Sequence, residues 1–406
     1  MALLAMFAVA VAVVGVSAAG LTVFSVWDAA NSLNANAVVL DEDEEIPPSL
    51  GAIEGGVNLL MVGTDSCDGQ NAALSSACQN GDTEGERNDV TMLVHISDEP
   101  RRVTVVSFPR DMIVPIPACP NPDGGEYSAM SAQKINASYS YGGLACTART
   151  VEALIGDKID FAAAIRWTGV INMSDAIGGV EVCVAGDIKD EHTGLSLTAG
   201  THTLQGVQAL QFLRVRHGIG DGSDLGRISN QQQFMSSLVR TLQSDAVLAN
   251  PSVLLKLATT AVSQVQQEQL VLSQSLANPT LMVQIAMAVK DVPYEDIVFV
   301  QYPTYYESSY EGELLLPVTQ AADVLFTALR ENQPITLTGE ASQGFGVEVT
   351  GEAAQPTATP SPTPDASAEG GSADETPAAT TPETRVDLPS DIAGQTAAQT
   401  TCTVPE

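Results

Sequence analysis

Short apolar strands that alternate with helical stretches constrain the fold of this chain more than any other feature. Residues 57–65 (VNLLMVGTD), 90–97 (VTMLVHIS) and 101–111 (RRVTVVSFPRD) are β-branched, apolar runs bounded by turn residues. Helical patterns follow near 148–157 and 168–177, with further strands at DFAAAIRW and GVEVCVAG. Continuous apolar runs are typical of strands that are covered on both faces. The pattern therefore predicts an α/β fold with a mixed central β-sheet flanked by helices on both faces.

The second half of the chain is mainly helical. Helical patterns run over 204–213, 223–244, 251–265, 279–290 and 318–332. Ser223 or Asp224 is suited to cap the second of these, and a strand, IVFVQYP, precedes the last. A hydrophobic content of 44% is ample for one large core, and no internal repeat is present. We expect a single large domain over residues 51–335.

The N-terminal segment is apolar and carries no charge before Asp28. About 27 residues at 1.5 Å per residue make a helix of roughly 40 Å, which is enough to cross a hydrocarbon core of about 30 Å. We expect a transmembrane anchor over residues 1–27 and an acidic linker over 28–50, with the rest of the chain extracytoplasmic. A cleaved signal peptide is the alternative, because small residues around Ser17 resemble a cleavage site.

Six cysteines without CxxC spacing favour disulfides over a metal site, and hence an oxidising compartment. Cys67 and Cys78 form the most local pair. The partners of the other four, Cys119, Cys146, Cys183 and Cys402, stay open at this point. The last segment, residues 336–406, is rich in Pro, Thr, Ala and acidic residues, and we expect it to be a disordered, solvated tail.

Positive charge is scarce and local. The chain has 49 acidic and 17 basic residues, which argues against a nucleic-acid partner because phosphate backbones need a broad basic surface. Yet Arg214, Arg216 and Arg227 lie within one segment, QFLRVRHGIGDGSDLGRISNQ. Arg227 and Gln231 share a helix face at a spacing of four. Arg214 and Arg216 share a face only in extended chain, so the preceding helix is expected to end near Leu213.

Further charged residues stand at strand ends, where a core does not need them. Asp65 ends the first strand, Arg87 and Asp89 open the second, and Arg110 ends the third. Sites in α/β sheets form at the carboxyl ends of strands. Carboxylates suit a hard divalent cation, and arginine forks suit phosphate oxygens. Each arginine alone is more simply a surface ion pair, but as a set they indicate a pyrophosphate clamp.

Other common chemistries lack their signatures. The four histidines, His95, His192, His202 and His217, show no HExxH or other paired ligand spacing. No GxxxxGK[ST] loop and no GxSxG elbow is present. These absences disfavour P-loop nucleotide hydrolysis, a zinc enzyme and a serine hydrolase.

The motifs taken together resemble the LytR-CpsA-Psr family. The resemblance covers about residues 58–244, through LLMVGTD, RNDVTML, VVSFPRDMIVPIP, KINASYSYGG, AIGGVEV, LQGVQALQFLRVRH and SDLGRISNQQQF in family order. It implies a membrane-anchored, extracytoplasmic enzyme. Such enzymes move a cell-wall glycopolymer of teichoic acid, arabinogalactan or capsule type from a polyprenyl-pyrophosphate carrier to peptidoglycan, through a phosphodiester.

The resemblance also implies roles for single residues. Asp65 and Asp89 match aspartates associated with Mg²⁺, and Arg87, Asp89 and Arg110 match catalytic positions. The implied pyrophosphate-binding set is Arg110, Arg214, Arg216, Arg227, Gln231 and Lys134. Asn88 and Asn230 depart from the family pattern without removing any of these residues. Two alternatives remain, namely a polyprenyl-pyrophosphate hydrolase with the same site and a non-catalytic wall-binding protein.

Overall fold

The computed structural model describes most of the chain between residues 37 and 406. The described residues are 33, 37–41, 47, 49–52, 56–67, 69–74, 76–80, 86–121, 124–248, 250–309, 312–342, 346–354 and 385–406. The anchor expected over 1–27 lies outside them, as does most of the linker expected over 28–50. No helix within the described ranges combines the length and the apolar character that a bilayer span requires.

A mixed sheet of seven strands forms the centre, in the order β13-β8-β1-β2-β3-β14-β20. The strands are β13 (Leu270–Leu272), β8 (Phe161–Arg166), β1 (Val57–Thr64), β2 (Asn88–Ile96), β3 (Val103–Phe108), β14 (Ile297–Gln301) and β20 (Gly394–Thr396). β1 is parallel to β8 and β3 is parallel to β14, whereas β2 runs antiparallel to both β1 and β3. The carboxyl ends of β1, β3, β8 and β14 therefore meet at one edge of the sheet, together with the start of β2.

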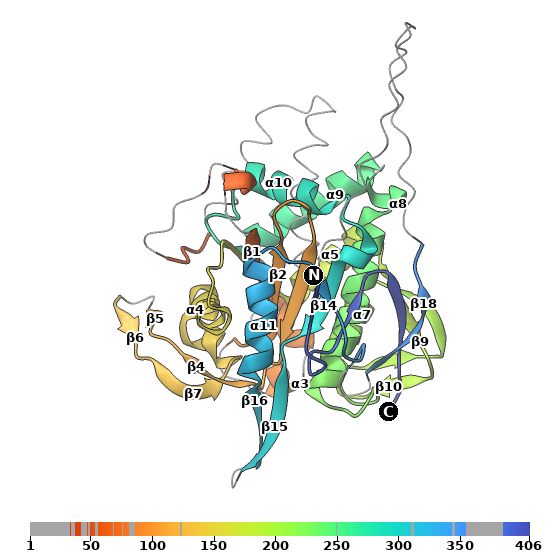
Figure 1. Cartoon of the computed structure of the whole chain (residues 1–406). Coiled ribbons are helices and arrows are strands. Elements are labelled where there is room, and N and C mark those ends of the chain that lie inside the picture. Colours follow the sequence, from red (N-terminus) through yellow and green to blue (C-terminus); the bar gives the residue numbers. More distant parts are fainter. Residues whose placement is uncertain are drawn as a thin grey trace, which may run out of the picture.

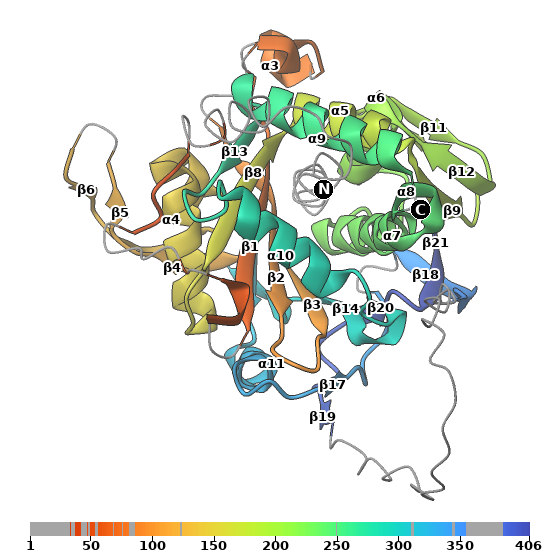
Figure 2. The same ribbon diagram turned by 90° about the horizontal axis from the view of Figure 1, so that it is seen from above.

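Helices cover both faces of this sheet (Figure 2). α4 (Ala137–Ile155) and α11 (Thr319–Arg330) lie on one face. The other face is covered by α5 (Trp167–Ile177), α7 (Asp224–Gln243), α9 (Pro251–Gln266) and α10 (Pro279–Val289). Successive side chains of a strand point to opposite faces. Leu60 and Val62 therefore belong to the hydrophobic core under α4 and α11, and Leu59 and Met61 belong to the core under α5, α7, α9 and α10. The predicted mixed sheet flanked by helices on both faces is confirmed.

The arginine segment spans the end of one helix and the start of the next. α6 (Gly206–Arg214) ends one residue later than predicted, so Arg214 is still helical and the extended chain begins at Val215. α7 starts at Asp224 after Ser223, whose side chain accepts a hydrogen bond from the backbone N–H of Gly226. This is the N-cap geometry that Ser favours, and it confirms the expected start of this helix.

The expectation of a disordered tail over 336–406 is wrong for its described parts. β21 (Gln399–Thr403) lies between β9 (Val180–Val184) and β18 (Val347–Glu352), in a second sheet that β12 (Gly200–Leu204) completes. Leu388, Ile392 and Ala397 are buried. The average composition of the segment hid these few apolar residues, which are enough to anchor short strands on an existing core. The folded unit thus extends past residue 335 to residue 406.

All six cysteines form disulfides, which confirms the predicted preference for disulfides over metal ligation. The local pair, Cys67–Cys78, is confirmed. Cys119 pairs with Cys146, and Cys183 pairs with Cys402. The last bridge ties β9 to β21, neighbours in the second sheet that are 219 residues apart in sequence.

Several short elements surround the two sheets. They are η1 (Leu50–Ala52), η2 (Gly69–Leu74), α3 (Ser76–Asn80), β5 (Cys119–Pro120), β6 (Glu126–Tyr127), β10 (Ile188–Asp190), β11 (Leu195–Leu197), α8 (Asp245–Leu248), η3 (Tyr294–Asp296), β17 (Ile335–Thr336) and β19 (Val386–Asp387). Two antiparallel ribbons stand apart from the sheets: β4 (Ile113–Ile116) with β7 (Met130–Lys134), and β15 (Thr304–Ser309) with β16 (Gly312–Pro317). The β15–β16 hairpin projects beyond the body of the protein (Figure 1).

Candidate active site

The predicted site residues gather at the edge of the sheet where the parallel strands end. Asp65 directly follows β1, and Arg110 follows β3. Thr64 pairs with Asn88, which places Asp89, the second residue of β2, at the same edge. The backbones of Asp65 and Arg87 are joined: Asp65 N–H donates to Arg87 O at 3.1 Å, and Arg87 N–H donates to Asp65 Oδ1 at 2.8 Å.

Arg110 lies next to three carboxylates. Its Nη1 donates to Asp89 Oδ1 at 2.6 Å, and its backbone N–H donates to Asp224 Oδ2 at 3.3 Å. Its Nε lies 3.6 Å from Asp111 Oδ2 and 3.7 Å from Asp224 Oδ1, too far for a good hydrogen bond. Burial opposes the charge of the guanidinium, but Asp89 and Asp224 outweigh it and raise the pKa of Arg110.

Arg227 comes from the first turn of α7 and is almost completely buried. Its Nη2 lies 2.5 Å from Asp224 Oδ1, and the exposed fractions of the two side chains are 5% and 4%. The same Nη2 donates to the backbone oxygen of Asp89 at 3.1 Å. Burial lowers the pKa of Arg227, and the charge of Asp224 opposes this shift. Asp224, which the sequence suggested only as a helix cap, thus holds two arginines in place.

Arg214 and Arg216 complete an arginine cluster, by which we mean Arg110, Arg214, Arg216 and Arg227. The guanidinium of Arg214 lies 3.9 Å above the centre of the Trp167 ring, and its Nη1 donates to Leu74 O at 3.4 Å. Burial lowers its pKa, and the charges of Asp89 and Asp65 act against that shift. Arg216 is near enough to Asp111 and Arg227 to influence the pKa of each.

The remaining predicted residues stand at the margin. Lys134 binds Asp111 through an Nζ–Oδ1 contact of 2.7 Å, and so reaches the cluster through a second residue. Gln231 donates from Nε2 to Leu213 O at 2.8 Å and joins α7 to the end of α6. Arg87 is exposed, and its contacts with Asp65 are made by its backbone.

Three guanidinium N–H groups in the cluster are buried without an acceptor. The Nε atoms of Arg110, Arg216 and Arg227 have no hydrogen-bond partner among the described residues. Buried polar groups are nearly always paired in native proteins, and an unpaired one costs roughly 1–3 kcal/mol. Three such donors within one arginine cluster indicate an anionic ligand with several oxygens.

Asp65 and Asp89 fit a divalent cation that also binds such an anion. Burial, and then repulsion by the charge of Asp89, raise the pKa of Asp65 to about 6. A cation between the two carboxylates would relieve this repulsion. Within the described ranges no three His, Cys, Asp or Glu side chains form a metal site by themselves. Mg²⁺ commonly takes only one or two carboxylates together with substrate phosphates, so the pair is sufficient for it.

An apolar pocket adjoins the cluster on the α7 side of the sheet. About 420 Å³ of empty space is lined by Met61, Val62, Gly63, Val90, Met92, Ile165, Leu213, Gln231 and Met235. A second apolar pocket of about 400 Å³ lies at the opposite end of the same sheet face, lined by Val103, Val105, Val239, Leu242, Gln243, Val289 and Ile297. Neither the pockets nor Trp167 could be found from the sequence, because strand residues that line a pocket follow the same pattern as core residues.

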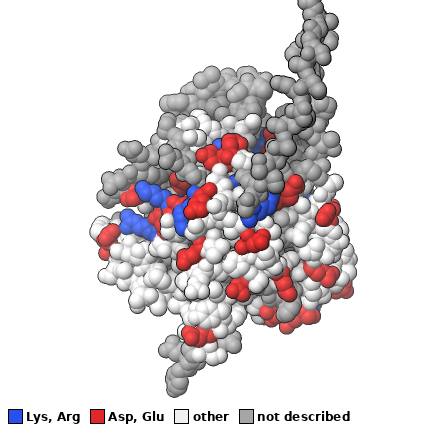
Figure 3. Space-filling model, in the orientation of Figure 1, with Lys and Arg blue, Asp and Glu red and all other residues white. Residues whose placement is uncertain are grey.

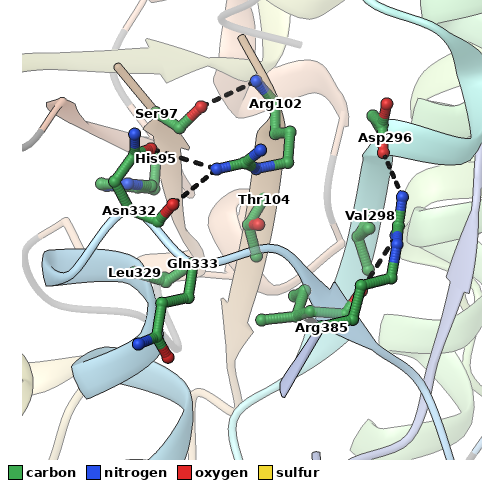
Figure 4. Close-up of a pocket in the computed structure, with 11 residues that line it drawn as sticks. His95, Ser97, Arg102, Thr104, Asp296, Val298, Leu329, Asn332, Gln333 and Arg385 are labelled. Atoms are coloured by element: carbon green, nitrogen blue, oxygen red, sulfur yellow. Dashed lines mark hydrogen bonds and ion pairs between the residues drawn. The ribbon is translucent and has the colours of Figure 1, made fainter. Parts of the chain in front are cut away.

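A polar pocket at the other end of the sheet is separate from this site (Figure 4). His95, Arg102, Asn332 and Arg385 are among its lining residues. Its two arginines bind neighbouring groups: Arg102 Nη2 donates to Asn332 O at 2.6 Å, and Arg385 Nη2 lies 3.0 Å from Asp296 Oδ1. Burial lowers the pKa of His95 to about 4, so this histidine is neutral. We interpret these contacts as structural, because they hold separate segments of the chain together.

The face of the protein that carries α11 shows no continuous basic surface. Figure 3 shows its Lys and Arg side chains interspersed with Asp and Glu. Among the described residues, the arginine cluster is thus a local concentration of positive charge in an acidic protein, whose formal net charge is -32.

Comparisons with known proteins agree with the fold and the motifs. Residues 24–328 match the model of the LytR_cpsA_psr family. The chain is 33% identical over 216 residues to the probable cell wall biosynthesis protein LcpB of Corynebacterium glutamicum, covering 52% of this chain and 48% of that protein. It is 30% identical over 233 residues to the polyisoprenyl-teichoic acid--peptidoglycan teichoic acid transferase TagT of Bacillus subtilis, covering 54% of this chain and 68% of that protein.

A solved structure supports the same fold. TagT bound to LIIa-WTA is similar with a TM-score of 0.52 and 19% identity, covering 73% of this chain and 98% of that one. The chain spans about half the length of the two curated relatives from Corynebacterium glutamicum, 48% and 44%. Because the family match extends over about three quarters of the sequence, the chain belongs to the LytR-CpsA-Psr family.

Proposed function

We propose that this protein is a Mg²⁺-dependent phosphotransferase. It attaches a cell-wall glycopolymer, of teichoic acid, arabinogalactan or capsule type, from a polyprenyl-pyrophosphate carrier to peptidoglycan through a phosphodiester. The observation that carries the proposal is the set of buried, unpaired Nε donors of Arg110, Arg216 and Arg227 next to an apolar pocket. The names of the related transferases support the same reaction.

The arginine cluster would bind the pyrophosphate oxygens and hold them in one orientation. Asp224 and Asp89 fix Arg110 and Arg227 before the substrate arrives, so little reorganisation is needed on binding. Asp65 and Asp89 would hold Mg²⁺, which when bound neutralises charge on the phosphates. A hydroxyl oxygen of the acceptor forms a bond to phosphorus as the bond to the bridging oxygen breaks. The hydroxyl proton ends on the departing polyprenyl phosphate, so no further reactant is required.

The two apolar pockets support a lipid carrier. They lie on one face of the sheet, the first beside the arginine cluster and the second near the starts of β3 and β14. A chain that follows this face would place its pyrophosphate at the cluster and its far end near α10, whose Met287 is 55% exposed. An apolar lining lets such a carrier leave the membrane without exposing its hydrocarbon chain to water.

The proposed location is the outer side of a cell membrane, with a single-pass anchor in residues 1–27. The carrier is a membrane lipid, and three disulfides fit an oxidising compartment. The uncharged N-terminal segment is long enough to span a bilayer.

The test is to incubate the full chain in detergent with lipid-linked glycan, Mg²⁺ and soluble peptidoglycan fragments, with label on the phosphate next to the sugar. We expect label on peptidoglycan, and its loss by at least about 100-fold in Arg227→Ala or with Mg²⁺ chelated. Arg101→Ala is the matched control, since Arg101 binds Asp98 and Glu99 at the opposite end of the sheet. Label found only on free polymer phosphate would show a hydrolase, and no turnover by the wild-type chain would refute both enzymatic functions.

A further inference from the structure

The β15–β16 hairpin and the β4–β7 ribbon form one continuous strand surface beside the site. Met112, just before β4, pairs with Leu315 of β16. This bridge joins the two ribbons edge to edge, although residues 116 and 304 are far apart in sequence. Figure 1 shows both ribbons at the same end of the protein, with the hairpin extending farthest.

The two faces of this surface differ. Met112 and Leu315 are buried, at 0% and 4% exposure, against the core under α4 and α11. Residues that pair across strands share a face, and neighbours along a strand point to opposite faces. The opposite face therefore carries Ile113, which pairs with Lys134, and Tyr305, which pairs with Leu316. We call Ile113, Lys134, Tyr305 and Leu316 the outer face.

The outer face carries one exposed aromatic ring and reaches the site through Asp111. Tyr305 is 47% exposed, which is unusual for a large aromatic side chain in a strand. At the other end, Lys134 Nζ lies 2.7 Å from Asp111 Oδ1, and Asp111 Oδ2 lies 3.6 Å from Arg110 Nε. A ligand along the outer face would thus end at the arginine cluster.

The geometry of phosphoryl transfer indicates which substrate approaches from the side of the two ribbons. The attacking and leaving oxygens lie roughly in line on opposite sides of the phosphorus. The apolar pocket for the carrier, with Met61 and Met235, is on the α7 side of the sheet. The ribbons pack on the core of the α4 and α11 side. The pocket for the leaving polyprenyl phosphate and the ribbons are therefore on opposite faces of the sheet. An in-line attack then brings the acceptor hydroxyl from the side of the ribbons.

We propose that the outer face binds the glycan strand of the acceptor, with the Tyr305 ring stacked on a sugar ring. This inference rests on the proposed function, since only a transferase needs an acceptor. The flat, apolar face of a tyrosine ring suits the C–H bonds on one side of a pyranose, and its hydroxyl suits the sugar's polar groups. Lys134 is already paired with Asp111, and Glu307 shares the face of Tyr305. With no unpaired cation, the outer face suits a neutral glycan better than an anionic polymer.

Tyr306, the next residue of the same strand, is a matched control for Tyr305. Tyr306 is 49% exposed, close to the 47% of Tyr305, but it lies on the face of Leu315. Replacing either tyrosine removes the same amount of exposed aromatic surface from the same strand. Only Tyr305 is on the outer face.

The experiment compares Tyr305→Ala, Tyr305→Phe and Tyr306→Ala in the full chain. We expect Tyr305→Ala to raise the KM for soluble, uncrosslinked glycan strands about tenfold, with kcat and the KM for the lipid substrate within about twofold. Tyr305→Phe keeps the ring and should stay near the wild type, as should Tyr306→Ala. Binding of the same glycan strands without lipid substrate is measured in parallel by calorimetry, and a soluble polyanion such as a glycerol-phosphate polymer serves as the comparison probe.

Each result decides the matter. Equal effects of Tyr305→Ala and Tyr306→Ala, or no effect of either on glycan affinity, would overturn the proposal. Binding of the polyanion in preference to the glycan strands, lost in Tyr305→Ala, would assign the face to the donor polymer and also overturn it. If the wild-type chain binds glycan strands through Tyr305 but transfers nothing, the outer face stands and the proposed transferase function fails.

Discussion

Asp224→Asn is the change that most directly tests how the arginine cluster is held. Asp224 is 4% exposed, lies 2.5 Å from Arg227 Nη2, and accepts the backbone N–H of Arg110 at 3.3 Å. The amide keeps the shape of the side chain and an acceptor oxygen but removes the charge. Arg110 keeps Asp89 at 2.6 Å, so Arg227 is the residue that loses its compensating charge.

The expected loss of stability follows from that burial. Leaving one partner of a buried ion pair uncompensated costs about 3–5 kcal/mol. The lost negative charge in the first turn of α7 adds about 0.5 kcal/mol. Because a domain of this size shifts by roughly 1–2 °C per kcal/mol, the melting temperature should fall by about 4–11 °C. Asp323→Asn, an exposed carboxylate on α11, should change it by less than about 1 °C.

A second measurement separates charge from packing. Mg²⁺ with inorganic pyrophosphate should raise the melting temperature of Asp224→Asn more than that of the wild type, because the anion supplies the charge that Asp224 provided. Differential scanning fluorimetry over a pyrophosphate titration measures both shifts. An unchanged melting temperature, or equal protection of both proteins, would refute the claim that Asp224 neutralises Arg227.

Further substitutions test other parts of the structure. Arg214→Lys keeps the charge but loses the planar stack on Trp167, so we expect weaker pyrophosphate binding by roughly tenfold and a changed tryptophan fluorescence response on titration. Replacing Cys183 and Cys402 by serine should destabilise the protein by about 2–3 kcal/mol more than replacing Cys67 and Cys78. The reason is that the first disulfide closes a loop of 219 residues and the second a loop of 11 residues. Chemical unfolding without reductant measures the difference. Burial and the charge of Asp157 raise the pKa of Asp160 to about 6. That value is above the unfolded one, so this group stabilises the fold increasingly as pH falls from above 6 toward 4. Asp160→Asn should therefore raise the melting temperature more at pH 8 than at pH 4.5, and the opposite order would contradict the assignment.

The central sheet could be predicted because its strands are buried on both faces and carry continuous apolar runs. Leu59 and Leu60, for example, both read as core even though they face different helices. The helix α6 ends at Arg214, one residue beyond the expected end near Leu213, and Arg214 stacks on Trp167 from this last helical position. The sequence could not reveal that partner because it is 47 positions away.

The site was predictable where charge stood out against its surroundings and not where it matched them. Arg110, Arg214 and Arg227 were found as rare cations near strand and helix ends, and the structure brings them together. Asp224 looked like one more acidic residue at a helix start. Arg87 was expected to act through its guanidinium, but its described contacts with the site are those of its backbone. Only three-dimensional proximity distinguishes these cases.

The position of β21 has a consequence for how the chain matures. β21 is made 219 residues after β9, yet the two are parallel neighbours tied by Cys183–Cys402. At about 5–20 residues per second, roughly 10–40 s of synthesis separate them. During that time the edge of β9 that will face β21 has no partner strand, and such edges readily pair with other chains. The nascent protein therefore depends on protection of this edge until β21 has been made, and the Cys183–Cys402 bridge then fixes the two strands together.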